Sequence, residues 1–295
     1  MAADSSIEPC RVGELVYPSV AYGIEGPCKV SVGTCGYSYN EWVDSGFYPQ
    51  GTMTSDMLAL YCSCFSVVEL NYTWYQMARA EALSRMLESA PSQLLFSAKL
   101  TRTMTHDPGS DWQEQLLAFR QGIAPLKDRL LAILIQLPAE FDRSVVNRNY
   151  LAGLLGGLEG LPVAVEFRHP SWAIDSVFVE LERREISMVT VDEPELPGAF
   201  PFLDVVTNPR LFYVRLHGRN VSGWHSGNMQ KKFNYDYADA ELRDVRDRHL
   251  LRMAARSTRG VIFFNNHVQG RAPENAKHLL KILAKQGDSI GAFNG

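Results

Sequence analysis

The sequence predicts a (β/α)8 barrel, an α/β fold, from two observations. Short β-rich apolar runs recur eight times between residues 30 and 264, and helical periodicity fills the intervals between them. Several runs, such as Leu131–Ile135, are apolar without alternation, which is typical of parallel strands buried on both faces. Strand followed by helix, repeated eight times, is the pattern of this barrel. A doubly wound open sheet is the alternative, but it more often has about five to seven strands.

The expected strands are, in order, Val30–Val32, Val67–Leu70, Leu94–Ala98, Leu131–Leu137, Val163–Phe167, Met188–Val191, Leu211–Leu216 and Val261–Phe264. Between them, apolar residues at positions i, i+3, i+4 and i+7 predict amphipathic helices, with Leu58, Leu83, Leu116 and Ala276 opening four such sets. Helix starts are expected near Asp111 and Ser171, and helices should end near Pro91 and Pro125.

Residues 1 to 28 show no clear period and contain several prolines and glycines. They predict an N-terminal extension outside the core, followed by a barrel domain over residues 29–295.

The composition is that of an ordinary folded protein. Of 295 residues, 46% are hydrophobic and 21% are charged, which excludes intrinsic disorder. No apolar run approaches the roughly 20 residues of a membrane span, and the start of the chain lacks the features of a signal peptide. Five cysteines without a Cys-x-x-Cys pair favour free thiols in a reducing compartment. We therefore expect a cytoplasmic protein with no membrane partner; the sequence does not predict its oligomeric state.

Polar residues follow almost every expected strand. Because the active sites of this barrel lie at the carboxyl ends of the strands, these residues are the site candidates. In a strand, residues two positions apart share a face. If the faces that carry these polar residues point into the barrel, its mouth contains Glu69, Lys99, Glu166, Arg168, Asp192, Arg215, His217 and Asn265. The further candidates for ligand binding are Tyr37, Asn71, Arg219 and Asn266. Buried charges at this density need partners or a ligand.

Each candidate also has a purely structural interpretation. Glu166–Arg168 and Asp192–Arg215 could be ion pairs that neutralise one another. His106 and His267 are expected to be loop histidines. Four aromatic residues are expected to pack in the barrel rather than to stack on a ligand: Tyr37, Trp42, Trp74 and Trp172. The cluster as a whole is more typical of a functional site.

At these residues the chain resembles the YecE-like family, also called domain of unknown function 72. The resemblance runs from Gly33 to Ala276 and begins with Gly33-Thr34-Cys35-Gly36-Tyr37 and Val68-Glu69-Leu70-Asn71. Its most specific segments are Glu166-Phe167-Arg168-His169-Pro170-Ser171-Trp172, Tyr213-Val214-Arg215-Leu216-His217-Gly218-Arg219 and Phe264-Asn265-Asn266.

The resemblance implies a TIM barrel and supports the strand-end assignments. Cys35 stands where the family pattern has Ser, and Trp74 where it has Phe, so no role is expected for a hydroxyl at position 35. The family has no settled activity. Its barrel is similar to those of endonuclease IV and the xylose-isomerase-like enzymes, which implies a DNA-related role by analogy of fold alone.

The residue types limit the metal chemistry of the site. No two histidines have a recognised metal spacing, and Lys99, Arg168 and Arg215 would repel a dication, so a three-zinc site is not expected. A single weakly held Mg²⁺ or Mn²⁺ on Glu166, Asp192 and His217 stays open. The chain contains no Gly-x-Gly-x-x-Gly or phosphate-loop motif, so neither a dinucleotide nor a nucleoside triphosphate is indicated.

The positively charged residues of the site suit an anion better than a metal cation. Lys99, Arg168, Arg215 and Arg219 could hold a phosphate or carboxylate. The long segment 218–234, which ends shortly after Lys231-Lys232, follows the seventh expected strand, where this barrel usually binds phosphate, and its length and glycines suit a closing lid. Glu69 and Glu166 would then be general-base candidates, with Asp192 a further catalytic candidate and His217 an acid or proton shuttle.

Three functions remain open from the sequence. The first is a hydrolase or lyase acting on a phosphate-containing substrate, with nucleic acid included. A second is a non-catalytic protein that binds a small anion or nucleic acid in the same pocket; since the net charge is −4, a basic nucleic-acid site would have to be local. The third is a sugar-isomerase-like enzyme that uses Glu166, Asp192 and His217 on a metal.

Overall fold

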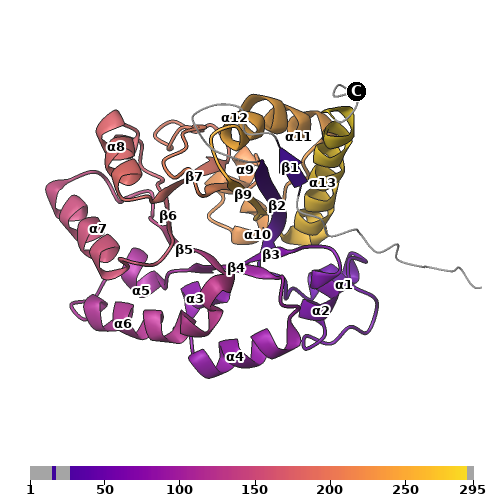
Figure 1. Ribbon diagram of the computed structural model, residues 1–295, viewed down its shortest axis with the longest axis horizontal. Coiled ribbons are helices and arrows are strands. Elements are labelled where there is room, and N and C mark those ends of the chain that lie inside the picture. The colour runs from indigo at the N-terminus through magenta and orange to yellow at the C-terminus, as the bar shows by residue number, and fades with distance from the viewer. Residues whose placement is uncertain (1–14, 18–26, 291–295) are drawn as a thin grey trace, which may run out of the picture.

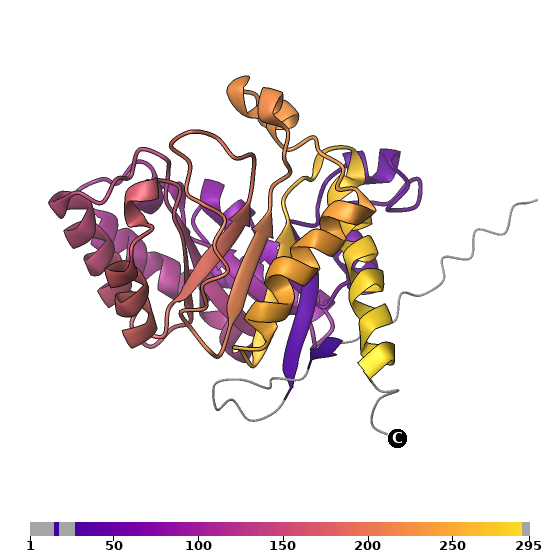
Figure 2. The ribbon, with the colours of Figure 1, turned by 90° about the horizontal axis from the view of Figure 1, so that it is seen from above.

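The computed structural model describes residues 15–17 and 27–290, in which eight parallel strands close into a barrel ringed by helices (Figure 1, Figure 2). These strands are β2 Cys28–Cys35, β3 Val67–Leu70, β4 Leu95–Lys99, β5 Leu130–Gln136, β6 Val163–Glu166, β7 Ser187–Asp192, β8 Phe212–Leu216 and β9 Arg259–Phe264. Each strand pairs with the next along the chain, and β2 pairs with β9 to close the barrel. The predicted (β/α)8 barrel is confirmed, with small shifts at the strand ends.

The helices lie outside the strands and in the loops that connect them. They are α1 Glu41–Asp44, α2 Met57–Cys62, α3 Tyr72–Tyr75, α4 Ala80–Ser89, α5 Arg102–Thr105, α6 Trp112–Ile123, α7 Val145–Gly157, α8 Asp175–Arg183, α9 Val221–His225, α10 Met229–Lys232, α11 Asp239–Val245, α12 Leu251–Ala254 and α13 Arg271–Ile290. A π-helical turn, Arg246–Leu250, joins α11 to α12, and short 3-10 helices cover Ala124–Arg129, Pro170–Trp172 and Val268–Gly270. None of the helices in the described part of the chain has the length and apolar character that a membrane span requires.

One of the two expected helix starts is wrong. Asp111 occupies the N-cap position of α6, as predicted. Ser171 instead lies inside the 3-10 helix Pro170–Trp172, and α8 begins four residues later at Asp175. The hydroxyl of Ser171 accepts a hydrogen bond from the backbone N–H of Arg143, at 2.8 Å, so it ties two loops together and caps no α-helix.

The strand β1, Leu15–Tyr17, belongs to the predicted N-terminal extension and runs antiparallel to Cys28–Val30 of β2. On that edge of β2, β3 pairs only with Thr34 and Cys35. β1 therefore covers the first part of an edge that would otherwise expose unpaired backbone groups. The rest of the predicted extension, residues 1–14 and 18–26, lies outside the described residues.

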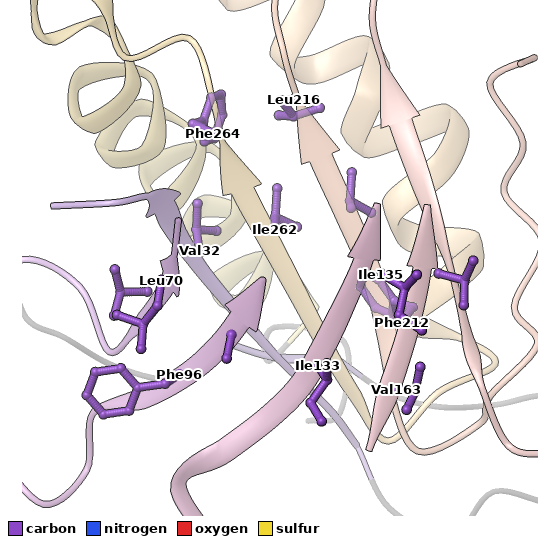
Figure 3. Close-up of a cluster of buried hydrophobic side chains, with 14 of the residues drawn as sticks. Val32, Leu70, Phe96, Ile133, Ile135, Val163, Phe212, Leu216, Ile262 and Phe264 are labelled. Atoms are coloured by element: carbon purple, nitrogen blue, oxygen red, sulfur yellow. The ribbon is translucent and has the colours of Figure 1, made fainter. Parts of the chain in front are cut away.

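Successive residues of each strand alternate between the helices and the barrel lumen. Figure 3 shows the layer between strands and helices, which contains Val32, Leu70, Phe96, Ile133, Ile135, Val163, Phe212, Leu216, Ile262 and Phe264. The opposite strand faces form a second cluster in the lumen, with Val67, Leu134, Ala164, Val189, Val191, Tyr213 and Phe263 among its members. This alternation decides which polar residues at the strand ends reach the mouth of the barrel.

Two helical glycines provide a matched test of the packing around the barrel. A Cβ on Gly122 of α6 would lie 2.1 Å from the carbonyl oxygen of Ala78, whereas a Cβ on Gly156 of α7 would meet nothing within 4 Å. We expect Gly122→Ala to lower the free energy of unfolding by about 1–3 kcal/mol, because backbone must move. Gly156→Ala should raise it by up to about 1 kcal/mol, because alanine favours helix. Urea denaturation measures both; equal stability of the two variants would contradict the close approach of α6 to Ala78.

Candidate functional site

A cavity of about 720 Å³ lies at the carboxyl end of the barrel strands. All eight barrel strands, or the loops that follow them, contribute to its wall: Tyr39, Asn71, Trp74, Lys99, His106, Gln136, Arg168, Glu193, Arg215, His217, Trp224, Lys232, Asn265 and His267 are among the lining residues. Its size and its mixture of aromatic and charged groups suit a small-molecule ligand.

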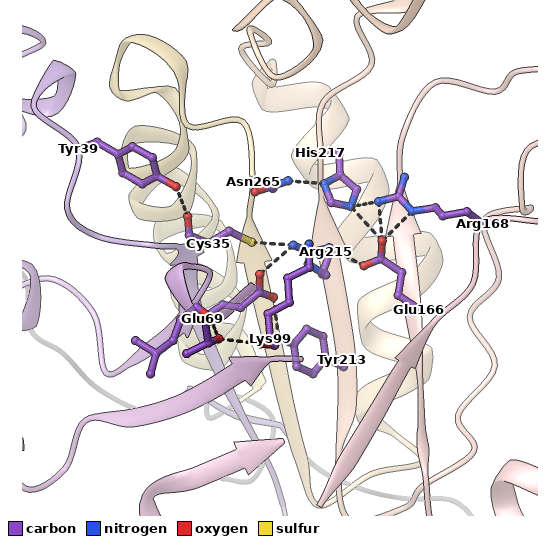
Figure 4. A network of polar contacts seen from close by, with 12 residues as sticks. Cys35, Tyr39, Glu69, Lys99, Glu166, Arg168, Tyr213, Arg215, His217 and Asn265 are labelled. Atoms are coloured by element: carbon purple, nitrogen blue, oxygen red, sulfur yellow. Dashed lines mark hydrogen bonds and ion pairs between the residues drawn. The ribbon is translucent and has the colours of Figure 1, made fainter. Parts of the chain in front are cut away.

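Arg215 extends from β8 into the lumen at the base of this cavity and joins two other strands, β3 and β6 (Figure 4). Its Nη1 donates to Oε2 of Glu166 on β6 at 2.6 Å, and its Nη2 donates to Oε1 of Glu69 on β3 at 2.8 Å. The second oxygen of Glu69 accepts from the hydroxyl of Tyr213 at 2.7 Å. Both carboxylates are completely buried. Such burial is tolerable because the guanidinium supplies their counter-charge and hydrogen bonds.

The chain of charges continues through Arg168. Its Nε donates to Oε1 of Glu166 at 2.7 Å, and its Nη1 pairs with Glu193 in the loop after β7. Burial alone would raise the pKa of Glu166, but the guanidinium groups of Arg168 and Arg215 outweigh it and hold the pKa well below its usual range. Glu166 is therefore an ionised partner for two arginines, which is a poor setting for a general base.

His217 is neutral in this setting. Burial, followed by the charge of Arg168, lowers its pKa well below the usual value. Nη2 of Arg168 lies 2.8 Å from Nε2 of His217, so this nitrogen accepts a hydrogen bond and the proton sits on Nδ1. Nδ1 is 2.8 Å from Nδ2 of Asn265, and the alternative orientation of this amide lets its oxygen accept a hydrogen bond from Nδ1–H. His217 thus orients Arg168.

Two lysines enter the cavity without an acidic partner. Within the described residues, no carboxylate lies within 4.0 Å of the ammonium of Lys99, the last residue of β4, or of Lys232 on α10. The Nζ of Lys99 lies 4.8 Å from the ring centroid of Trp74, and that of Lys232 lies 3.7 Å from the ring centroid of Trp224. Burial lowers the pKa of each lysine to about 8, and the charges of Arg215 and Arg168 beside Lys99 and of Arg168 beside Lys232 add to this effect.

Several buried polar atoms of the cavity wall have no hydrogen-bond partner among the described residues. Three are donors, namely Nε of Arg215 and the indole Nε1 atoms of Trp74 and Trp224, and one is an acceptor, Oδ1 of Asn71. Buried polar groups are normally paired, so four unpaired atoms around one cavity are exceptions to the usual pattern.

Eight of the predicted site residues come together here: Glu69, Asn71, Lys99, Glu166, Arg168, Arg215, His217 and Asn265. The expected Glu166–Arg168 pair is present. The alternative Asp192–Arg215 pair does not form, because Arg215 binds Glu69 and Glu166.

The expected inward position of Asp192 is wrong. Val189 and Val191 occupy the lumen face of β7, so alternation turns Asp192 toward the helices. There it accepts hydrogen bonds from Nε of Arg219 at 2.9 Å and from the hydroxyl of Tyr237 at 3.1 Å. Arg219, also predicted to bind ligand, is held outside the cavity by this pair.

Asn266 and Tyr37 are likewise outside the cavity. Asn266 follows Asn265 and faces the opposite way, where its amide donates to the carbonyl of Tyr235 at 2.8 Å and to Oδ1 of Asn275 at 2.7 Å. Tyr37 packs against the ring of Tyr61, as its structural interpretation predicted.

The outward turn of Asp192 also separates the three residues considered for a divalent metal. In the part of the chain that the structure describes, no three or more His, Cys, Asp or Glu side chains gather where they could hold a metal ion. A metal on Glu166, Asp192 and His217 does not fit this arrangement.

Sequence reasoning missed Glu193, Tyr39 and Trp224, which all line the cavity. Alternation identifies Glu193 as the next inward residue only once the structure has shown that Val191 faces the lumen. Trp74, expected to pack in the barrel, is instead part of the wall beneath Lys99, whereas Trp42 and Trp172 are buried in the core as expected.

The segment 218–234 covers one side of the cavity. It carries α9 and α10, which rise above the end of the barrel in Figure 2. Its side chains Trp224, Met229, Gln230, Lys232 and Phe233 line the cavity. Gly218, where the segment begins, has a φ of +91°, and a Cβ there would lie 2.4 Å from that of Tyr235. A residue other than glycine would disturb this departure from β8.

Comparisons with known proteins give a consistent result. Residues 31–293 match the family model described as "Protein of unknown function DUF72". The UPF0759 protein YunF of Bacillus subtilis (strain 168) is 29% identical over 260 residues, covering 82% of this chain and 92% of the relative. The crystal structure of a DUF72 family protein from Thermotoga maritima MSB8 superposes with a TM-score of 0.79 at 33% identity, over 86% of this chain and 99% of that one. A DUF72 family protein from Enterococcus faecalis V583 gives a TM-score of 0.77 at 27% identity, over 86% and 95% of the two chains.

The charge network predicts a large cost for removing Arg215. We expect Arg215→Met to lower the free energy of unfolding by about 3–5 kcal/mol at neutral pH, because it leaves Glu69 and Glu166 buried without their shared cation. The loss should shrink at about pH 5, since protonation then relieves the unpaired carboxylates. Urea denaturation at both pH values measures this. Arg243→Met, which breaks an exposed pair with Asp239 on α11, is the control and should cost little; similar losses for both variants would contradict the network.

Proposed function

The chain belongs to the DUF72 family, and we propose that it binds a small molecule bearing a phosphate or carboxylate group in the cavity at the carboxyl end of its barrel. The observation that carries this proposal is the pair of lysines in the wall. Arg168 and Arg215 are neutralised by glutamates, but Lys99 and Lys232 have no carboxylate within ion-pair distance among the described residues. Their charge is available to a ligand.

The chemistry of the wall favours an anion. Burying an ammonium group away from water costs free energy unless an opposite charge or an aromatic face stabilises it. Trp74 and Trp224 offset part of that cost, and an anionic group of a ligand in the cavity would offset more. Lys232 also lies in the loop after the seventh barrel strand, where this fold commonly binds phosphate.

The shape of the site favours a small molecule over a nucleic acid. A polymer requires a groove in which several cations follow successive phosphates. Here the cavity is lined by residues from the ends of all eight barrel strands and from α9 and α10, and the whole chain has a net charge of −4. Cleavage of a phosphate ester by Glu69 or Glu166 is not part of the proposal, because both carboxylates are buried behind Arg215.

We place the protein in the cytoplasm as part of the same proposal. Cys28, Cys35, Cys62 and Cys64 are free thiols, which suits a reducing compartment. Cell fractionation tests this, and recovery of the mature chain from an oxidising compartment would contradict it.

Sulfate is a suitable probe for the site, because its charge is constant over the accessible pH range. We expect Lys99→Met and Lys232→Met each to weaken sulfate binding at least about tenfold, which corresponds to the loss of one charge-assisted hydrogen bond. Isothermal titration calorimetry measures this. The control is Lys231→Met, at an exposed position beside Lys232 on α10. Equal affinity in all four proteins would contradict the proposal. Tighter, lysine-dependent binding of short single-stranded DNA would replace the small molecule by a polymer.

Binding should also weaken at alkaline pH. Only the protonated lysines attract an anion, and the pKa of both Lys99 and Lys232 in the free protein is lowered to about 8. Sulfate affinity should therefore fall as the pH rises through about 8, with the midpoint moved somewhat upward because the bound anion favours the charged form. Calorimetry across about pH 7 to 9.5 follows this loss. Unchanged affinity over that range would show lysines with the ordinary pKa of about 10.4.

A further inference from the structure

We infer that Lys99 forms an imine with the carbonyl carbon of the bound ligand, so that the ligand is an aldehyde or ketone that also bears a phosphate or carboxylate. This inference rests on the proposed function, because it requires the same cavity and the same anionic group. It goes further in assigning a covalent role to one of the two lysines and a reactive group to the ligand.

The position of Lys99 suits a nucleophile. It is the last residue of β4, on the strand face that points into the lumen, and it lines the cavity. Its backbone is fixed, since its carbonyl accepts a hydrogen bond from the hydroxyl of Thr73 at 2.6 Å. Residues that carry the chemistry in this fold come from the ends of barrel strands.

The surroundings of Lys99 leave its amine free to react. An ion pair would hold the group protonated, but no carboxylate of the described residues lies within 4.0 Å of it. The amine lies over the ring of Trp74. The ring of His106 packs edge-on against the same indole, with 5.0 Å between the ring centroids. Burial lowers the pKa of His106 to about 4, so this neighbour is neutral as well.

The lowered pKa of Lys99 increases the fraction of its amine that is uncharged at neutral pH. With a pKa of about 8, about one amine in ten is uncharged at pH 7, compared with about four in ten thousand for a lysine of ordinary pKa. Only the uncharged amine attacks a carbonyl carbon.

Lys232 is the less suitable nucleophile. Its ammonium lies 3.7 Å from the ring centroid of Trp224, a close cation–π contact that favours the charged form. It is also carried by α10, a short helix of the segment over the cavity. We assign Lys232 to the anionic group of the ligand and Lys99 to its carbonyl carbon.

The step is balanced without any further reactant. The lone pair of the Lys99 amine attacks the carbonyl carbon, a C–N bond forms and the carbonyl oxygen becomes a hydroxyl group. That hydroxyl leaves with a proton as water, so that amine and carbonyl give imine and water. A protonated imine withdraws electrons from the neighbouring C–H and C–C bonds, and the reaction class served is therefore proton transfer or bond cleavage beside a carbonyl.

The rival explanation is that Lys99 acts only as a fixed positive charge. Lys99→Arg separates the two roles, because arginine keeps the charge but has no amine that forms an imine. Lys231→Arg is the matched control at an exposed site on α10.

The test is reductive trapping on the full chain. Pyruvate supplies a ketone with a carboxylate, and dihydroxyacetone phosphate supplies a ketone with a phosphate. Each is incubated with the protein and reduced with borohydride, and intact-mass and peptide mass spectrometry then locate the adduct. We expect one adduct per chain, located on Lys99 in the unaltered protein, suppressed by sulfate, at least about tenfold lower in Lys99→Arg and unchanged in Lys231→Arg.

The possible failures are distinguishable. Sulfate binding that depends on Lys99, with no adduct or with adducts spread over exposed lysines, overturns the imine and leaves the proposed function standing. An adduct on Lys232 reverses the assigned roles and overturns the inference in the form given. Absence of both sulfate binding and trapping removes the proposed function and the inference together. Peptide mapping of the unaltered protein decides the site even if a variant fails to fold.

Discussion

The bridge from Arg215 to Glu69 and Glu166 is the interaction on which the mouth of the barrel depends. One guanidinium joins β3 to β6 across the lumen, at a depth where neither carboxylate reaches water. The same Glu166 holds Arg168, and Arg168 in turn holds Glu193 and meets His217. Each charge is therefore positioned by its neighbour, and the network forms the floor of the cavity. Because the arginines and glutamates of this network pair with one another, the charges of Lys99 and Lys232 remain available for a ligand.

Much of the fold could be predicted from the sequence because its strands are nearly continuous apolar runs. A run such as Leu131–Leu137 needs burial on both faces, and eight of these separated by helical periods leave few arrangements other than a closed parallel barrel. The start of α8 could not be predicted in this way. Ser171 has the side chain of a good N-cap, but a tertiary hydrogen bond from Arg143 uses its hydroxyl.

The residues of the candidate site could be predicted only for strands whose sequence shows which face points into the lumen. Glu69, Glu166 and Arg215 alternate with apolar neighbours whose burial on the helix side is evident, so their inward direction follows. In β7 both faces are buried, and nothing in Met188–Val191 shows that Val189 and Val191 face the lumen, so the outward direction of Asp192 does not follow from the sequence. Trp224 and Lys232 line the cavity because the long segment 218–234 passes over it, and no local sequence pattern predicts that path.

A crystal soaked in selenate offers the most direct measurement of the central claim, that Lys99 and Lys232 form an anion site. Selenate has the shape and charge of sulfate, and its selenium atom can be located by anomalous scattering. The account predicts a strong peak inside the cavity, with oxygen atoms within hydrogen-bond distance of the Nζ atom of Lys99 or Lys232. Peaks only at exposed basic residues such as Lys231, with none beside either cavity lysine, would contradict it.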